Sequence, residues 1–275
     1  MKRVLLALIA LSGAITGMAQ DSTGKDKADT IRVGGMIIIK DHKDDTAKRN
    51  RNITISNHKK QKSSNLSTNW WIVDIGFANL KDETNYAQAR SSGFVSSDVG
   101  KDQLDLKTGK SVNVNVWFFM QKLNVVKHVV NLKYGLGLEL NNYRFDNEMI
   151  RFSKNPTKIT LDNDLKDVKK NKLAADYITV PFMVNFNLTP RQKKGFGFSA
   201  GVSAGMLYSA RQKIKDNGNK DKLHDDFDLE KWKLSYIGEL NLGPVRLYGS
   251  YARNNMWEKG LDQTPYNVGI RLSHW

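Results

Sequence analysis

The 275-residue sequence has no cysteine, only five prolines and, after residue 19, no run of 18 apolar residues. Without cysteine the chain can form neither a disulfide framework nor a lipid-modified N-terminal cysteine. Without a long apolar run, no segment after residue 19 is predicted to cross a membrane as a helix. A mean hydropathy of −0.52 suits a soluble protein, but a membrane-spanning strand needs an apolar residue only at every second position. A transmembrane β-barrel is therefore still compatible with this composition.

The first 20 residues, MKRVLLALIALSGAITGMAQ, have the parts of a secretory signal peptide: a basic lead, a short apolar core and small residues before a cleavage site. Residues 1–19 are interpreted as this signal, which predicts export through the inner membrane. The formal charge of +15 would suggest nucleic acid as the partner of a cytoplasmic protein. For an exported chain, no nucleic-acid partner is expected, and lipid phosphates or acidic glycans become the candidate anions.

Residues 20–68 are predicted to be a basic periplasmic arm and linker. Residues 46–68 contain six Lys or Arg and no acidic residue, which is typical of a solvated, mostly irregular segment. A small hairpin between residues 37–39 and 53–55 is an alternative within this arm. Contact of the arm with the envelope or a periplasmic protein is the alternative to a simple tether.

Eight segments between residue 69 and the C-terminus alternate apolar residues with polar or small ones. This period of two is typical of strands with one apolar face. The predicted strands cover residues 70–80, 111–120, 130–140, 177–188, 195–209, 232–242, 245–253 and 266–275. Their connections alternate between long and short, as in outer-membrane barrels. The predicted fold is all-β: an eight-stranded antiparallel up-and-down transmembrane β-barrel over residues 69–275, preceded by a mostly irregular N-terminal arm.

The stretch GFGFSAGVSAGMLYS, residues 195–209, separates a membrane barrel from a soluble one. From residue 195 to residue 205, every second residue of this stretch, on the side opposite the apolar residues, is Gly or Ser. The solvent-facing side of a soluble barrel or sandwich would carry longer polar side chains. An eight-stranded barrel has a narrow interior, so small residues there make room for larger inward side chains. Aromatic residues are expected to form girdles at the two membrane interfaces. The predicted interface aromatics are Trp70, Trp71, Tyr177, Tyr208, Trp232, Trp257, Tyr266 and Trp275.

Several strand segments and the last residue carry a family resemblance. They are WWIVDIGFANL, LDLKTGKSVNVNVWFF, YITVPFMVNF, LNLGPVRLYGSYA and the terminal Trp275, together with the Ala-Gln cleavage site. They resemble the Bacteroidetes-type outer-membrane β-barrel family, which includes PorT-like proteins of the Gram-negative envelope. The resemblance covers residues 70–275 and implies outer-membrane location, insertion by the barrel-assembly machinery and no catalytic signature. Trp275 departs from the family pattern because it shares the parity of Ser273, which predicts a bulge or a frayed end.

Charged residues on the inward parity are predicted to pair with one another inside the lumen. They are Asp74, Lys133, Glu139, Lys233, Glu239, Arg246 and Arg271. Buried charges are tolerated when they are paired and hydrogen-bonded, and eight strands leave no aqueous channel. The hypothesis is a network that plugs the lumen, with a proton or ion path as the alternative, and a general diffusion porin is rejected. Pro181 predicts a bulge in the fourth strand because it lacks a backbone donor.

Two loop segments are candidate sites. The loop 146–173 is rich in Lys, and contact with lipopolysaccharide phosphates is predicted, with a merely solvated loop as the alternative. The lysines concerned are Lys154, Lys158, Lys166, Lys169, Lys170 and Lys172. The stretch LHDDFD, residues 223–228, would suit a metal site or a hydrolase through His224. Because no triad spacing is present, we assign no catalytic, cofactor-binding or metal residue and expect no cofactor.

The predicted function is a non-enzymatic structural, assembly or secretion-accessory role in the envelope, as the PorT-like resemblance implies. A surface-binding protein acting through its long loops is one alternative, and a lipid A-modifying enzyme is another. The expected partners are outer-membrane lipid, lipopolysaccharide and the barrel-assembly machinery, with secretion-system or periplasmic proteins as a further alternative.

Overall fold

The computed structural model describes residues 29–33, 36–40, 64–166, 168–190, 192, 195–216 and 219–273. The chain divides into two compact units, Met1–Ser63 and Ser64–Trp275. Residues 1–19 and Trp275 lie outside the described residues, and so do the predictions made for them. Among the described residues, no helix is long and apolar enough to cross a membrane.

The first unit contains one hairpin in its described part. β1 (Asp29–Val33) pairs antiparallel with β2 (Met36–Lys40), and Ile31 faces Ile38. Residues 53–55 lie outside the described residues, so the pairing of residues 37–39 with them stays a prediction. Two glycines separate β1 from β2 in the sequence, and such a pair favours a tight hairpin turn.

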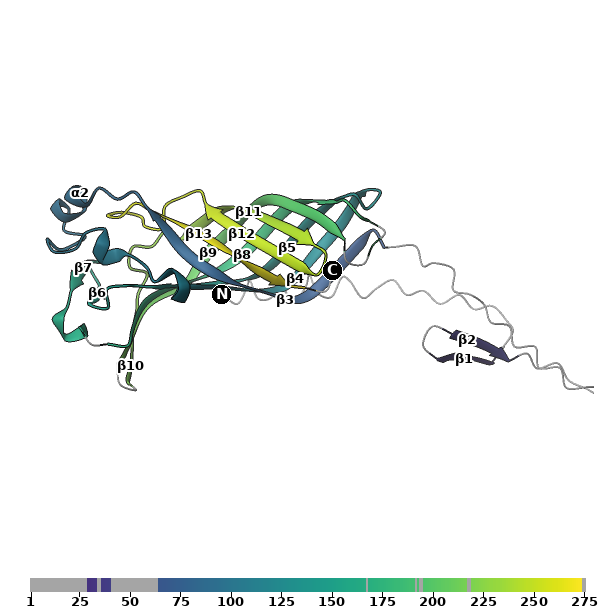
Figure 1. The fold of residues 1–275 in the computed structure, drawn as a ribbon, viewed down its shortest axis with the longest axis horizontal. Helices are drawn as coiled ribbons and strands as arrows, with labels where there is room; N and C mark the ends of the chain where they lie inside the picture. The colour runs from purple at the N-terminus through teal and green to yellow at the C-terminus, as the bar shows by residue number, and fades with distance from the viewer. Residues whose placement is uncertain are drawn as a thin grey trace, which may run out of the picture. The chain divides into compact units, whose positions relative to one another are not determined.

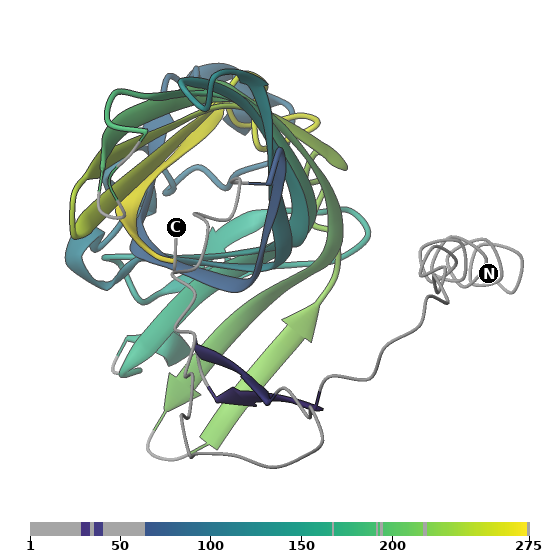
Figure 2. The same ribbon diagram turned by 90° about the vertical axis from the view of Figure 1, so that its right-hand side faces the viewer.

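The second unit is a closed antiparallel barrel of eight strands (Figure 2). β13 pairs with β3, which closes the ring, and the other strands pair in chain order. The strands are β3 (Leu66–Asp82), β4 (Val112–Val126), β5 (Val130–Arg144), β8 (Lys170–Asn187), β9 (Phe196–Asp216), β11 (Trp232–Leu242), β12 (Val245–Ala252) and β13 (Gln263–Leu272). The predicted fold class is confirmed.

Short and long connections lie at opposite ends of this barrel. At the short-turn end, Gly243 has a φ of +74° in the two-residue turn between β11 and β12, a conformation that glycine adopts without strain. The connections at the long-loop end contain structure of their own (Figure 1). They hold α2 (Tyr86–Ser91), η1 (Asp102–Leu104), η2 (Thr108–Lys110), β6 (Ile150–Phe152), β7 (Ile159–Leu161), η3 (Asn163–Leu165) and β10 (Asn219–His224).

The outer face of the barrel is an apolar band. Ile75, Phe77, Val180, Phe182 and Val268 are each at least half exposed, although their size would normally place them in a core. A continuous surface of such residues matches the lipid-facing band of a membrane barrel.

Aromatic residues border this band at the short-turn end because β3 and β4 share an irregularity. Trp71 has a φ of +56° and the β4–β5 register shifts between Trp117 and Phe119. The result is that Trp70 and Trp71, 61% and 69% exposed, both face outward and contact Phe119 and Phe118 at ring distances of 5.9 and 5.8 Å. The same shift turns Met120 into the lumen, where strict alternation predicted an outward side chain.

The bulge predicted at Pro181 is absent, and one lies a few residues earlier. The register of β8 with β9 is constant from Asn187 to Tyr177 and shifts between Tyr177 and Asp176. Against β5, the register is the same on both sides of Pro181, although no pairing occurs at Pro181 itself. The missing donor thus removes a ladder bond without inserting a residue.

Small inward residues of β9 make room for large ones on adjacent strands. Gly201 lies between Met183 of β8 and Ile237 of β11 in the register. Met183 and Ile237 pack with Ile72, Trp117 and Met120 in one apolar cluster inside the barrel. The alternation of Gly and Ser in residues 195–209 therefore has a packing origin.

The long connections fold into a cap with an apolar core. Residues from all four connections and from the barrel strands beneath them form one buried cluster. Phe152 stands near its centre, stacked on Trp257 at 6.0 Å and tilted against Phe145 and Phe227. The prediction treated these segments as separate outward loops, whereas the structure makes them parts of one body.

Candidate functional site: the filled lumen and the cap

Three carboxylates and three cations lie buried in the lumen. Asp74, Glu139, Glu239, Lys133, Lys233 and Arg271 are each at most 7% exposed. They come from β3, β5, β11 and β13, whose inward parity brings them together. Equal numbers of both signs make the group electrically balanced, which lowers the cost of burying each charge.

Asp74 is the most enclosed member of this group. Its carboxylate accepts two hydrogen bonds from Arg271, from Nε and Nη2, both at 2.7 Å. It also accepts a hydrogen bond from Trp117 Nε1 at 2.7 Å and from Asn115 Nδ2 at 3.2 Å. The guanidinium of Arg271 lies 5.5 Å from the Trp117 ring centroid. The two hydrogen bonds from Arg271 to Asp74 make a bidentate pair, which is the strongest geometry for an ion pair between arginine and a carboxylate.

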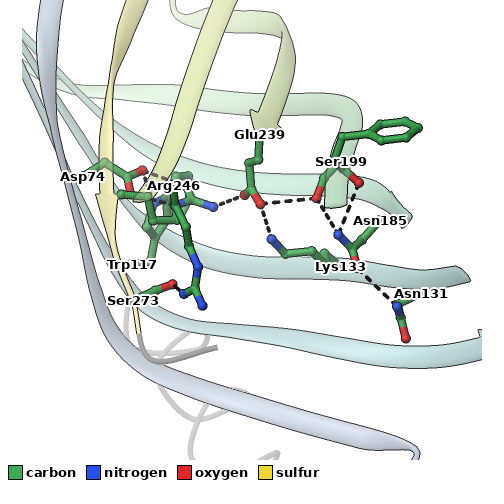
Figure 3. Close-up of polar contacts among 11 residues, drawn as sticks. Asp74, Trp117, Asn131, Lys133, Asn185, Ser199, Glu239, Arg246 and Ser273 are labelled. Carbon is green, nitrogen blue, oxygen red and sulfur yellow. Dashed lines mark hydrogen bonds and ion pairs between the residues drawn. The ribbon is translucent and has the colours of Figure 1, made fainter. Parts of the chain in front are cut away.

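Glu239 joins this pair to the rest of the lumen (Figure 3). Its carboxylate accepts from Arg271 Nη1 and from Lys133 Nζ, and from Ser199 Oγ at 3.3 Å. Ser199 in turn accepts from Asn185, which accepts from Asn131. The chain of contacts therefore runs from the middle of the barrel toward the short-turn end.

Glu139 forms the second half of the network. It accepts from Lys233 Nζ, from Asn267 Nδ2 at 3.1 Å and from Asn141 Nδ2 at 3.2 Å. Lys233 also lies over the Tyr177 ring, 5.5 Å from its centroid. The sequence did not single out these amide and aromatic partners, because alternation identifies the inward parity but not which inward side chains meet.

Arg246, the seventh predicted member, lies at the short-turn mouth. Its side chain is half-buried and donates to Ser273 Oγ (Figure 3). A cavity of about 170 Å³ opens here, and Lys122, Arg246 and Gln192 are among the residues that line it. The cavity reaches Lys133, Glu239 and Arg271 of the buried group. Beyond them, only about 30 Å³ of space remains among residues that include Trp117, Met183 and Ile237. This arrangement fills the lumen with paired side chains.

Two of the predicted interface aromatics belong to the cap. Tyr177 and Trp257 are 2% and 4% exposed and pack in the cap core, so the expectation that they face lipid is wrong. Tyr177 lies within the long-loop half of β8, and Trp257 lies in the connection between β12 and β13, so the cap covers both. Tyr208, Trp232 and Tyr266 remain on the outer surface.

Polar contacts fasten the cap connections to one another. Lys107 donates a hydrogen bond to Glu148 at 2.5 Å, and this bond lowers the pKa of the Glu148 carboxyl. Tyr86 donates to Asp82 at 2.6 Å, and burial together with this bond raises the pKa of the Tyr86 hydroxyl. Both pairs join residues that the sequence places in loops.

An open cavity of about 900 Å³ lies in the cap. Residues of three connections line it, including Gln88 of α2, Lys158 and Glu258. Its lining combines apolar and aromatic side chains with amide, hydroxyl and charged groups of both signs, and such polar groups can fix the orientation of a bound ligand.

The other loop candidates are dispersed. Lys154 and Lys158 are exposed around the β6–β7 hairpin, Lys166 and Lys169 follow η3, and Lys170 and Lys172 begin β8. His224 ends β10 opposite Arg211. The oxygens of Asp225 and Asp226 accept from nearby backbone amides at 2.9 and 3.4 Å. Within the described ranges, no group of three or more His, Asp or Glu could hold a metal ion.

Comparison with known proteins agrees with this architecture. A family model described as "Outer membrane protein beta-barrel domain" matches residues 76–254, more than half of the chain. No curated protein matches the chain. The chain therefore belongs to the outer membrane protein beta-barrel domain family and is an integral outer-membrane β-barrel protein.

Proposed function

We propose that this protein is a non-enzymatic, non-conducting outer-membrane barrel that binds a ligand at the cell surface through its cap. The observation that supports this most directly is the cavity of about 900 Å³ in a cap that has its own apolar core. Folded connections can hold a binding site in one shape, whereas independent loops would have to be ordered by the ligand at an entropic cost. Export by the signal peptide and insertion by the barrel-assembly machinery belong to the same proposal.

The filled lumen supports binding over transport. Each of its three carboxylates forms an ion pair with a buried lysine or arginine. Beyond the cavity of about 170 Å³ at the short-turn mouth, only about 30 Å³ of space remains. Deletion of the long loop 146–173 would be one test of surface binding, but it would also remove Ile150, Phe152 and Ile159 from the cap core. A point substitution in the cavity is the sharper test.

Gln88→Trp is expected to block the cavity. Gln88 is an exposed residue of α2 that lines it, so an indole at this position would occupy ligand space without entering the core. The purified protein in micelles would be screened against arrays of oligosaccharides and peptides. We expect the strongest interaction to weaken by at least about tenfold.

Lys110→Trp is the matched control, since Lys110 is an exposed cap residue outside the cavity lining. Its interaction should stay within about twofold of the parent. Equal losses in both variants, or an unchanged interaction in Gln88→Trp, would contradict the assignment of binding to this cavity.

A secretion-accessory, PorT-like role is the second candidate, and the cavity at the short-turn mouth supports it. Its lining includes Lys122, Arg246 and Gln192, and a basic, concave site at the periplasmic end would suit an acidic segment of a partner protein. We expect cells lacking the gene to lose a set of exported proteins, which the intact copy restores. The measurement is a proteomic profile of secreted and surface proteins. An unchanged profile would remove this candidate and leave surface binding.

A further inference from the structure

Six lysines lie in cross-strand register above the barrel. They are Lys170 and Lys172 of β8, Lys213 and Lys215 of β9, and Lys220 and Lys222 of β10. Lys215 faces Lys170 on one side and Lys220 on the other, and Lys213 faces Lys172 and Lys222 in the same way. Because residues two apart in a strand share a face, these two rows form one surface, which we call the lysine ladder.

The ladder is on the outer face of this sheet. On β9, Gln212 and Ile214, which flank Lys213, are 1% and 8% exposed and pack toward the cap. Gln212 Nε2 donates to the carbonyl of Ile150 at 2.8 Å, and Ile214 joins a small apolar cluster of the cap. The lysines on either side of these residues therefore point away from the cap.

The same face continues the lipid-facing surface of the barrel. On β8, Lys170 and Lys172 have the parity of the outward residues Ile178 and Val180. On β9, the register shift beside Tyr177 brings Lys213 and Lys215 onto this face as well. Tyr208, at the shift, is 46% exposed and stands where an interface aromatic is expected.

The hairpin of β9 and β10 bends away from the barrel at its long-loop end (Figures 1 and 2). When a strand bends away from the barrel axis, its outward face turns toward the flank of the barrel. In a membrane, that direction leads to the lipid surface. The bend and the parity together point the ladder at the headgroups of the outer leaflet.

The ladder carries uncompensated positive charge. Within the described part of the chain, none of its six lysines forms a salt bridge. Lys172 Nζ donates to the neutral Asn142 Oδ1, and the nearby Asp176 is already paired with Arg211. Like charges directly opposite each other on neighbouring strands are destabilising, so bound anions would relieve this repulsion.

We propose that the lysine ladder binds the phosphate groups of the glycolipid in the outer leaflet, of the lipid A type. Such phosphates lie at headgroup height, directly above the apolar band, where lysine side chains can reach them while their stems stay on apolar surface. This site is separate from the cap cavity. Of the lysines that the sequence singled out for lipopolysaccharide, the proposal keeps Lys170 and Lys172 and adds four from β9 and β10.

The test is lipid A binding by the full-length protein in phosphatidylcholine nanodiscs, measured by native mass spectrometry. A ladder variant would carry Lys172→Gln, Lys213→Gln, Lys215→Gln and Lys222→Gln. We expect at least about a tenfold loss of affinity for bisphosphorylated lipid A. Dephosphorylated lipid A should bind both proteins equally, because its recognition does not involve the phosphates.

The control variant removes the same number of charges from exposed cap residues outside both the ladder and the lining of the cap cavity: Lys101→Gln, Lys110→Gln, Lys154→Gln and Lys166→Gln. It should stay within about twofold of the parent. Circular dichroism would verify that both variants retain the barrel. The proposal is overturned if the control loses as much affinity as the ladder variant, or if the parent binds both forms of lipid A equally. It also fails if soluble polygalacturonate binds the ladder more tightly than lipid A does, because the occupant would then be a polysaccharide.

Discussion

Replacing Asp74 with alanine is expected to lower the free energy of unfolding of the barrel by about 3–5 kcal/mol. The carboxylate is fully buried and accepts hydrogen bonds from Arg271, Trp117 and Asn115. Its removal leaves the Arg271 guanidinium buried with half of its negative partners. Urea unfolding of the refolded protein in micelles, followed by tryptophan fluorescence, measures the loss.

Glu83→Ala supplies the matched control. Glu83 also forms an ion pair, with Lys81 at 2.9 Å, but both side chains are more than half exposed. Water screens such a pair, so its loss should cost far less than the loss of Asp74. If both variants lost the same amount, burial would not be the reason for the strength of the lumen contacts.

A double variant separates the ion pair from the space that it fills. Asp74→Leu combined with Arg271→Met removes both charges and keeps most of the volume, so it should be less destabilised than Asp74→Ala alone. A double variant as unstable as the single one would show that the neighbours Trp117 and Glu239 depend on the charges themselves. The expected result would show that the lumen tolerates these two side chains only when their charges balance, as the proposal of a non-conducting barrel requires.

The lumen charges could be predicted from the sequence because parity in a strand fixes the face of each residue. Asp74 and Arg271 share a row across β3 and β13, and each was expected to point inward. The error at Met120 has a local cause. A shift of one residue between Trp117 and Phe119 reverses the parity that follows it, and nothing in an alternating sequence marks where such a shift occurs.

The cap was harder to predict because its apolar residues follow no period. Phe94, Ile150, Phe152 and Phe227 come from three different connections, which meet only in the folded chain. Tyr177 and Trp257 were misplaced for the same reason, since proximity to a strand end suggests a membrane interface until the cap is known to cover it. The sequence does indicate part of the lysine ladder, because lysines lie two residues apart in three segments. Only the register of β8, β9 and β10 shows that these lysines lie opposite one another.

Gly201→Leu is expected to prevent the barrel from closing in its native register. A Cβ atom at Gly201 would lie 2.1 Å from the carbonyl oxygen of Phe182 and 2.6 Å from the Cα atom of Met183, both in the backbone of β8. A backbone cannot move aside as a flexible side chain can, so β8 and β9 would have to separate. Even Gly201→Ala should cost at least about 2 kcal/mol. Refolding yield, measured by the mobility difference between folded and heated barrel on gels, reports the effect.

Gly238→Ala tests whether any added methyl in this region is harmful. Gly238 lies on β11 opposite Ala200, in the row next to that of Gly201. The nearest atom to its added Cβ would be the Ser199 carbonyl oxygen at 3.8 Å, an ordinary contact. Removing a flexible glycine from a strand should leave the yield unchanged or raise it slightly. Normal refolding of Gly201→Leu would contradict the packing explanation for the small residues of β9. Failure of Gly201→Leu with success of Gly238→Ala would show that the lumen can fill only because Gly201 has no side chain. Met183 and Ile237 then pack on either side of this glycine, next to the paired charges.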